Sequence, residues 1–163
     1  MSSPDRSGFE EFVAARRGAL LRSAYLLTGN HDDAEDLVQV ALVKAVPHWA
    51  RIADNPEPYV RRILARESIT RWRRRRWREV STDAVPDTAG QPADADAVHD
   101  LRAALARLAP RQRAVVVLRY YEDLTERQTA EVLGISVGTV KSQSRDALTR
   151  LRGLLPDLAS VSA

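Results

Sequence analysis

The chain has 163 residues, of which 44% are hydrophobic and 29% are charged, a globular composition that fits one ordinary domain or two small ones. It contains no cysteine, which excludes a disulfide framework, a thiolate zinc site and a cysteine nucleophile and is consistent with a reducing compartment. Because it has neither a membrane-length apolar run nor a signal-peptide core, we expect a cytoplasmic protein without membrane insertion.

The net charge of +3 hides a strong segregation of charge along the chain. Residues 61–80 contain nine arginines and two glutamates, whereas residues 81–100 contain five aspartates and no basic residue. Residues 81–97 consist mainly of alanine, aspartate and other small residues, with Pro86, Gly90 and Pro92 among them, a composition that buries too little apolar surface to fold. We therefore predict a flexible acidic linker at 81–97 between two small modules, 8–80 and 98–156.

The hydrophobic spacing of the N-terminal module predicts three helices. The first covers about residues 8–28 and ends at Gly29, and Asn30 caps the second. The second extends to about residue 49, with Pro47 breaking or kinking its end. After a loop at 51–54, the third begins at Asn55-Pro56 and runs to about residue 78.

The C-terminal module also shows only helical periodicity, so the predicted fold is all-α. We expect a fourth helix over 98–108 and a fifth from Pro110 to residue 121. Thr125 should cap a sixth helix that reaches residue 133. Ser136 should cap a seventh that Pro156 stops.

Residues 71–78 hold six arginines and two tryptophans. On a helix their charge surrounds most of the circumference, and like charges three and four residues apart repel one another. A polyanion relieves that repulsion, and arginine and tryptophan also stack on unpaired bases. The block therefore indicates nucleic-acid binding; a solvated basic helix end, an acidic protein or a membrane surface are the alternatives.

Residues 125–143 have the spacing of a helix-turn-helix, with the small Ala130 where the helices cross and Gly134 in the turn. The N-terminal part of its second helix can enter a major groove. An ordinary helical hairpin with a glycine turn is the alternative. The polar candidates for contacts to bases and phosphates are Ser136, Thr139, Lys141, Ser142, Gln143 and Arg145.

Several segments, taken in order, resemble sigma factors of the sigma-70 family. Residues 33–39 resemble the acidic helix that binds RNA polymerase. Residues 55–78 resemble the helix that recognises the minus-ten promoter element. Residues 108–142 resemble region four, which reads the minus-thirty-five element. The short length and acidic linker resemble the extracytoplasmic-function (ECF) group, and residues 119–124 and 137–143 are closest to its sigma-E-like branch.

The resemblance implies roles for individual residues. Contacts to the β′ clamp helices of the RNA polymerase core would come from Glu35, Asp36, Gln39 and Lys44. The melted non-template strand at the minus-ten element would be bound by Asn55, Tyr59, Arg62, Arg66, Trp72, Arg73, Arg74, Arg75 and Arg76. Asn55 belongs to a loop that resembles one capturing a flipped base, although a helix-capping role also accounts for it. Region four would contact the β flap tip.

The resemblance is weaker at a few points. Many members of the family have an acidic residue at the position of Val40 and phenylalanine at the position of Leu42. An apolar residue is common at the position of Ser144, and arginine is usual at the position of Asp146. We expect Ser144 to loosen the packing of the recognition helix and Asp146 to repel phosphate. The acidic linker is either a mimic of RNA in the polymerase or a simple spacer.

No sequence pattern indicates catalysis, a cofactor or a metal site, since the three histidines are widely spaced and no phosphate-binding loop is present. We therefore expect a promoter-specificity subunit of RNA polymerase, possessing no enzyme activity of its own. Two alternatives remain: a free-standing helix-turn-helix regulator that binds duplex DNA as a dimer, and an interaction protein that docks an anti-sigma-like partner.

Overall fold

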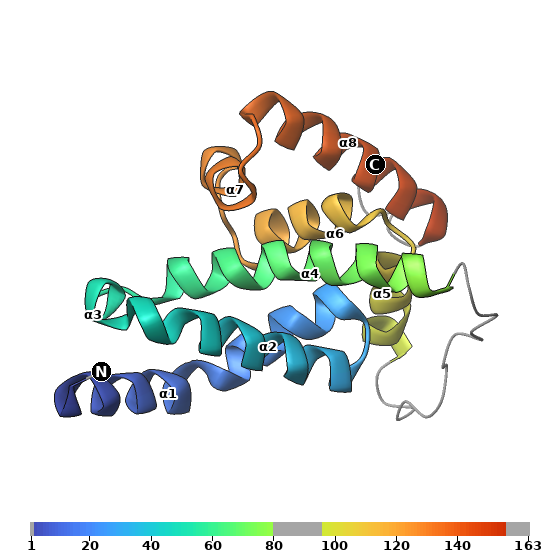
Figure 1. Ribbon diagram of the computed structural model, residues 1–163. Helices are drawn as coiled ribbons and strands as arrows, with labels where there is room; N and C mark the ends of the chain where they lie inside the picture. The colour runs from blue at the N-terminus through green and yellow to red at the C-terminus, as the bar shows by residue number, and fades with distance from the viewer. Residues whose placement is uncertain (1, 80–95, 156–163) are drawn as a thin grey trace.

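The computed structural model describes residues 2–79 and 96–155, and the side chains of all of these except 75–79 and 96–99. The described residues form helices and no strand, which confirms the predicted all-α fold (Figure 1). In order, the elements are α1 (Ser3–Thr28), α2 (His31–Ala45), the 3-10 turn η1 (Val46–His48), α3 (Trp49–Ile52), α4 (Glu57–Glu79), α5 (Asp96–Ala106), α6 (Pro110–Val116), the π-helical segment η3 (Val117–Tyr121), α7 (Glu126–Leu133) and α8 (Val137–Leu154).

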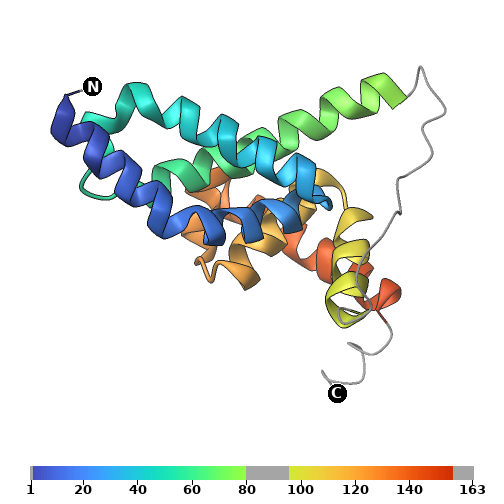
Figure 2. The same ribbon diagram turned by 90° about the horizontal axis from the view of Figure 1, so that it is seen from below.

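The long helix α4 lies in the middle of the molecule. Helices α1 and α2 cover one side of it, and α6, α7 and α8 lie on the other (Figure 1). Seen from below, α1 and α2 form the near layer (Figure 2). Helix α4 therefore contacts both the N-terminal and the C-terminal halves of the chain.

The turn between α1 and α2 has the predicted local chemistry. Gly29 adopts a left-handed conformation with φ of 85°, and its N–H donates to the Tyr25 carbonyl. The Asn30 side chain then accepts a hydrogen bond from the Asp33 N–H at 2.9 Å, which caps α2.

Two helices end differently from the prediction. Helix α2 stops at Ala45, before the predicted end near residue 49, because Pro47 lies in a 3-10 turn that separates it from α3. The predicted fifth helix changes to π-helical geometry at Val117, where the Glu122 N–H donates to the Val117 carbonyl at 2.9 Å. Such insertions are frequent at functional sites.

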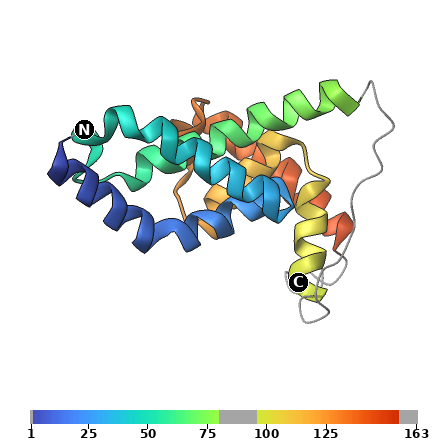
Figure 3. The same cartoon turned by 60° about the horizontal axis from the view of Figure 1, so that its bottom comes forward.

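The core is shared between the two halves of the chain. Ala114 and Val117 pack in the same buried cluster as Leu20, Leu37 and Leu64. A smaller cluster joins Ala65 of α4 to Leu118 and Val132. Figure 3 shows α6 and α8 behind the layer of α1, α2 and α4. The modules expected to hold separate small cores thus pack as one body in this structure.

Candidate nucleic-acid interface

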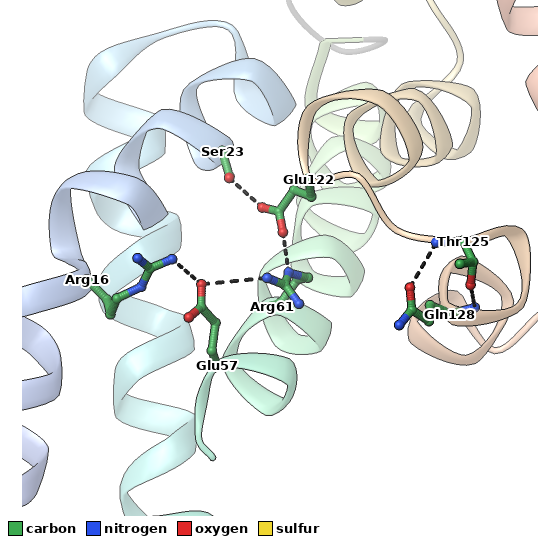
Figure 4. A network of polar contacts seen from close by, with 7 residues as sticks. All are labelled: Arg16, Ser23, Glu57, Arg61, Glu122, Thr125 and Gln128. Atoms are coloured by element: carbon green, nitrogen blue, oxygen red, sulfur yellow. Dashed lines mark hydrogen bonds and ion pairs between the residues drawn. The ribbon is translucent and has the colours of Figure 1, made fainter.

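Helices α7 and α8 form a helix-turn-helix whose ends are fixed by local hydrogen bonds. The Thr125 hydroxyl accepts from the Gln128 N–H at 3.0 Å, and the Gln128 side chain accepts from the Thr125 N–H at 2.9 Å (Figure 4). Gly134 supplies the turn with φ of 67°, and the Ile135 N–H donates to the Ala130 carbonyl. This reciprocal capping and left-handed glycine define where α7 begins and ends.

One face of α8 packs against the rest of the protein, which leaves its other side chains free to contact DNA. Val140, Ser144, Ala147 and Leu151 are buried at helical spacing. Ser144 is accommodated there because its hydroxyl lies 3.4 Å from the Tyr120 hydroxyl. A serine at this position therefore lies between α8 and η3, where Tyr120 is a polar partner for its hydroxyl.

The polar candidates on α8 divide between two sides of the helix. Lys141 and Arg145 are exposed and one turn apart, and Ser142 lies next to them with its hydroxyl on the Thr139 carbonyl at 3.0 Å. Ser136 caps α8 by accepting from the Thr139 N–H at 3.0 Å. Gln143, which is half-buried, shares the Thr139 side.

Asp146 is an exposed acid farther along α8, seven residues after Thr139 and three residues after Gln143. By helical spacing it shares their side of α8 and is farther from Lys141 and Arg145. Ser142, one turn before Asp146, lies closer to this acid, so the side of α8 that carries Lys141 and Arg145 is the more favourable one for phosphate.

A stripe of four candidates runs along one face of α4. Tyr59, Arg62, Arg66 and Arg73 recur at intervals of three, four and seven residues, and this spacing keeps them on one side of a helix. Arg62 and Arg73 are exposed, and Tyr59 is half-buried with Arg51 over its ring at 5.8 Å. Pro56 occupies the cap position of α4, because its carbonyl accepts a hydrogen bond from the Val60 N–H. Asn55, the residue before it, is exposed.

Trp72 lies away from that stripe. It lines a cavity of about 310 Å³ together with Arg71, Arg74, Asp33 and Asp36. The Arg71 guanidinium donates to the Asp33 carbonyl at 3.2 Å. The sequence grouped Trp72 with the arginines, but the structure brings it next to the first turn of α2. The side chains of Arg75 and Arg76 lie outside the described residues.

Helix α2 presents a separate surface. Glu35, Asp36 and Gln39 are exposed on it, and Val43, one turn after Gln39, is the most exposed of the large hydrophobic residues described at 68%. Sequence reasoning missed Val43, although an apolar residue on the polar face of an amphipathic helix is the signal that reveals it.

Two further residues of α2, Lys44 and Leu42, contact other parts of the protein. Lys44 forms an ion pair with Glu67 of α4. Leu42 is 7% exposed and belongs to the core. Lys44 nonetheless stays 53% exposed, so the exposed surface of this helix includes Lys44 together with Glu35, Asp36, Gln39 and Val43.

Comparison with known proteins identifies the family. Residues 12–78 match Sigma-70 region 2, and residues 104–153 match Sigma-70, region 4. The chain is 44% identical over 151 residues to the RNA polymerase sigma-E factor of Streptomyces avermitilis, covering 88% of this chain and 83% of that protein. The chain belongs to the ECF sigma factors of the sigma-70 family.

Other relatives place this sigma factor in the same group. It is 42% identical to the sigma-E factor of Streptomyces coelicolor, over 88% of this chain and 84% of that one. It is 35% identical to the ECF sigma factor SigL of Mycobacterium tuberculosis, over 94% and 89% of the two chains. It is thus a sigma-E-like, non-enzymatic factor that directs promoter-specific transcription initiation through regions 2 and 4.

A solved structure supports the same conclusion about the fold. The sigma factor RpoE of Bartonella quintana, in complex with the anti-sigma factor NepR, superposes with a TM-score of 0.68 at 28% identity, covering 91% of this sigma factor and 96% of that chain.

Among the described residues, no group of acidic or histidine side chains could hold a metal ion. In that same part of the chain, no helix has the length and apolarity needed to cross a membrane.

Proposed function

We propose that region 2 reads the minus-ten element through α4 and region 4 reads the minus-thirty-five element through α8. The domain limits we assign are 8–80 for region 2, 81–97 for an acidic linker and 98–156 for region 4. The observation that carries this proposal is the pair of cationic, exposed helix faces, one on α4 and one on α8, in the two matched regions.

The α4 stripe supports binding of melted DNA. Arg62 and Arg73 offer guanidinium groups to successive phosphates of the non-template strand, and Tyr59 offers a ring for stacking. Asn55, exposed before the cap position of α4, is the candidate for contact with a flipped base. Because flipping costs a few kcal/mol of unstacking, this contact needs the neighbouring arginines to hold the strand.

The α8 surface supports binding of duplex DNA. Its N-terminal half enters the major groove, where Lys141 and Gln143 reach base edges while Arg145 neutralises phosphate. Ser136, Thr139 and Ser142 add short hydroxyl contacts at the start of the helix. Phosphate contacts of this kind fix the register, and base contacts select the sequence.

The partners follow from the remaining surfaces. We propose that Glu35, Asp36, Gln39 and Val43 of α2 bind the β′ clamp helices of core RNA polymerase, and that region 4 binds the β flap tip. An anti-sigma factor is a further proposed partner, because the similar Bartonella sigma factor was crystallised with one. With these partners the proposed site of action is the cytoplasm, where transcription occurs.

In vitro transcription of fragmented genomic DNA tests this proposal. Core polymerase is incubated with and without the protein, and the 5′ ends of the transcripts are sequenced. We expect new start sites preceded by two shared sequence elements. A protein that protects a palindromic duplex without polymerase, and adds no start site, would instead be a free-standing regulator. Protection of no DNA at all would indicate a pure docking protein.

A further inference from the structure

The cavity beside Trp72 has the size of a small-molecule site. Its volume of about 310 Å³ is at the lower end of the range of about 300–1,000 Å³ that such sites occupy. It lies between the turn that joins α1 to α2 and the C-terminal half of α4, and these segments meet at the same end of the molecule (Figure 1). Arg113 of α6 borders the cavity as well. Its walls therefore come from several helices, which together hold their side chains in place.

Arg113 is a buried cation without an anionic partner. The residue is 4% exposed, and its guanidinium donates to four main-chain carbonyls, which carry no net charge. A guanidinium has five N–H groups, so one N–H of Nη1 has no acceptor among the described residues. No carboxylate in that part of the chain forms an ion pair with it. Because a buried charge is costly unless it is paired, an anion in the cavity would be stabilised by Arg113.

Two further guanidinium groups border the cavity from α4. Arg71 donates one N–H to the Asp33 main-chain carbonyl at 3.2 Å. Arg74 is exposed and has no hydrogen bond or ion pair with any other described residue. Guanidinium groups bind phosphate oxygens through parallel N–H donors, and such charge-assisted bonds are strong. The three arginines together therefore indicate a phosphate group.

The α2 side of the cavity has the opposite charge. Asp33 and Asp36 border it there, and an ionised carboxylate can only accept hydrogen bonds. These acids would repel a phosphate placed near them, so a ligand that fills the cavity needs hydrogen-bond donors in addition to its anion. Trp72 adds a flat aromatic surface on which a planar ring can stack. A nucleotide combines all of these properties: a phosphate, a planar base and N–H donors.

We propose that this cavity binds a guanine nucleotide. The phosphate contacts the arginines, the base stacks on Trp72, and the Asp36 carboxylate accepts from the edge of the base. Guanine presents two adjacent donors, N1–H and the N2 amino group, which match the two oxygens of one carboxylate. Adenine and cytosine present an amino group beside a ring acceptor, and uracil has no amino group. The carboxylate therefore selects guanine.

The nucleotide has two possible sources, because a free guanine nucleotide and a guanine in a DNA strand carry the same base and phosphate. The inference goes beyond the proposed function, since it needs neither polymerase nor a promoter. Binding to the full chain alone therefore tests the cavity separately. A protein that directs initiation but binds no guanine nucleotide loses only this inference, whereas one that binds the nucleotide and directs no initiation loses only the proposed function.

Isothermal titration calorimetry of the full chain with GMP tests the proposal. We expect one GMP per chain, and we expect guanosine and UMP to bind at least about 10-fold more weakly, because guanosine lacks the phosphate and UMP lacks the paired donors. Equal affinities for GMP and UMP, or for GMP and inorganic phosphate, would exclude recognition of the base. Absence of GMP binding at millimolar concentration would overturn the proposal.

A pair of arginine variants separates a specific site from general attraction to a basic helix. Arg74→Ala should weaken GMP binding at least about 10-fold, because a charge-assisted contact to phosphate is lost. Arg73 is exposed next to it and does not border the cavity, so Arg73→Ala removes the same charge and should change GMP affinity less than about 2-fold. Equal losses in the two variants would show diffuse attraction only and would contradict the proposal.

A pair of aspartate variants tests the contact to the base. Asp36→Asn replaces an acceptor oxygen with a donor and should weaken GMP binding about 10-fold, while binding of inorganic phosphate does not weaken. Asp32→Asn is the matched control, since Asp32 is exposed in the same turn of α2 and does not border the cavity. GMP affinity that Asp36→Asn leaves unchanged, or that both variants lower equally, would overturn the assignment.

Fluorescence anisotropy with labelled single strands distinguishes the two sources. An oligothymidylate is compared with the same strand carrying one central guanine. Tighter binding of the guanine strand, lost in Asp36→Asn and reversed by excess GMP, would show that the cavity takes a base from DNA. Equal binding of the two strands by a protein that binds GMP would show that the ligand is a free nucleotide. If neither GMP nor the guanine strand is preferred over its control, the proposal is wrong.

Discussion

Arg66 of α4 donates a hydrogen bond to the main-chain carbonyl of Val132, the residue that precedes Leu133 and Gly134 in the helix-turn-helix, at 2.8 Å. The bond joins the helix proposed to bind the minus-ten element to the motif proposed to bind the minus-thirty-five element. The two motifs are therefore in direct contact in this structure, through a side chain of α4 and the main chain of α7.

Replacement of Arg62 tests the α4 stripe, since this residue is exposed and lies outside the boundary with region 4. We expect Arg62→Ala to reduce open-complex formation and to lower the slope of log affinity against log salt by about 0.7, because one phosphate contact to a single strand is lost. Heparin-resistant complexes at a series of salt concentrations measure both. Arg17→Ala, an exposed change on α1, should leave the slope unchanged, and an equal effect of the two would remove Arg62 from the DNA contacts.

The two sides of α8 give opposite predictions. Lys141→Ala should weaken transcription from promoters that depend on the minus-thirty-five element while core binding is retained, because a base-edge or phosphate contact is worth about 1–3 kcal/mol. Asp146→Asn should strengthen binding to the same element by removing a negative charge near phosphate. Fluorescence anisotropy with duplex DNA, and a parallel core-binding assay, separate the effects. Loss of core binding by Lys141→Ala would refute its placement.

Val43 tests the proposed polymerase surface on α2. Its side chain is 68% exposed, so Val43→Asp should leave the free energy of unfolding within about 0.5 kcal/mol of its original value. Affinity for core polymerase should fall about 10-fold or more, because a charge is placed in an apolar contact. Ala103→Asp on α5 is the control. Undiminished core binding by Val43→Asp would exclude this face from the interface.

Arg113 is predicted to stabilise the folded protein as a buried cation. Its side chain donates to four main-chain carbonyls, and the residue is 4% exposed. Arg113→Met should lower the free energy of unfolding by about 3 kcal/mol, because the carbonyls lose charged donors. Urea denaturation measures this, with the exposed Arg111→Met as control.

The pH dependence of Arg113 has a definite sign. Burial lowers the pKa of the Arg113 guanidinium from its ordinary value to about 10, so the group stays protonated from pH 6 to 9 and contributes no slope of stability there. Because the folded protein binds this proton less tightly than the unfolded chain does, this group makes stability rise with pH above about 10. Equal effects of Arg113→Met and Arg111→Met in urea would contradict the role assigned to Arg113.

Local chemistry was predictable from the sequence, whereas long-range partners were not. Thr125, Gly134 and Ser136 act on residues within five positions of themselves, so their caps and turn followed from residue types alone. Glu122 instead meets Ser23, 99 residues away, and Arg66 meets Val132, 66 residues away. Periodicity carries no information about such pairs, nor does it place Trp72 beside Asp33 and Asp36 of α2.

The central claim, that α4 and α8 read two separate promoter elements, is tested most directly by cleavage of DNA from a tethered iron chelate. The cysteine-free chain allows single attachment points at Thr70→Cys, beside Arg66 and Arg73 on the α4 stripe, and at Thr149→Cys, one turn after Arg145. In complex with core polymerase at a promoter, we predict two cleavage centres about 25 base pairs apart, or about 85 Å of duplex. Centres that coincide, or cleavage from only one site, would contradict the account.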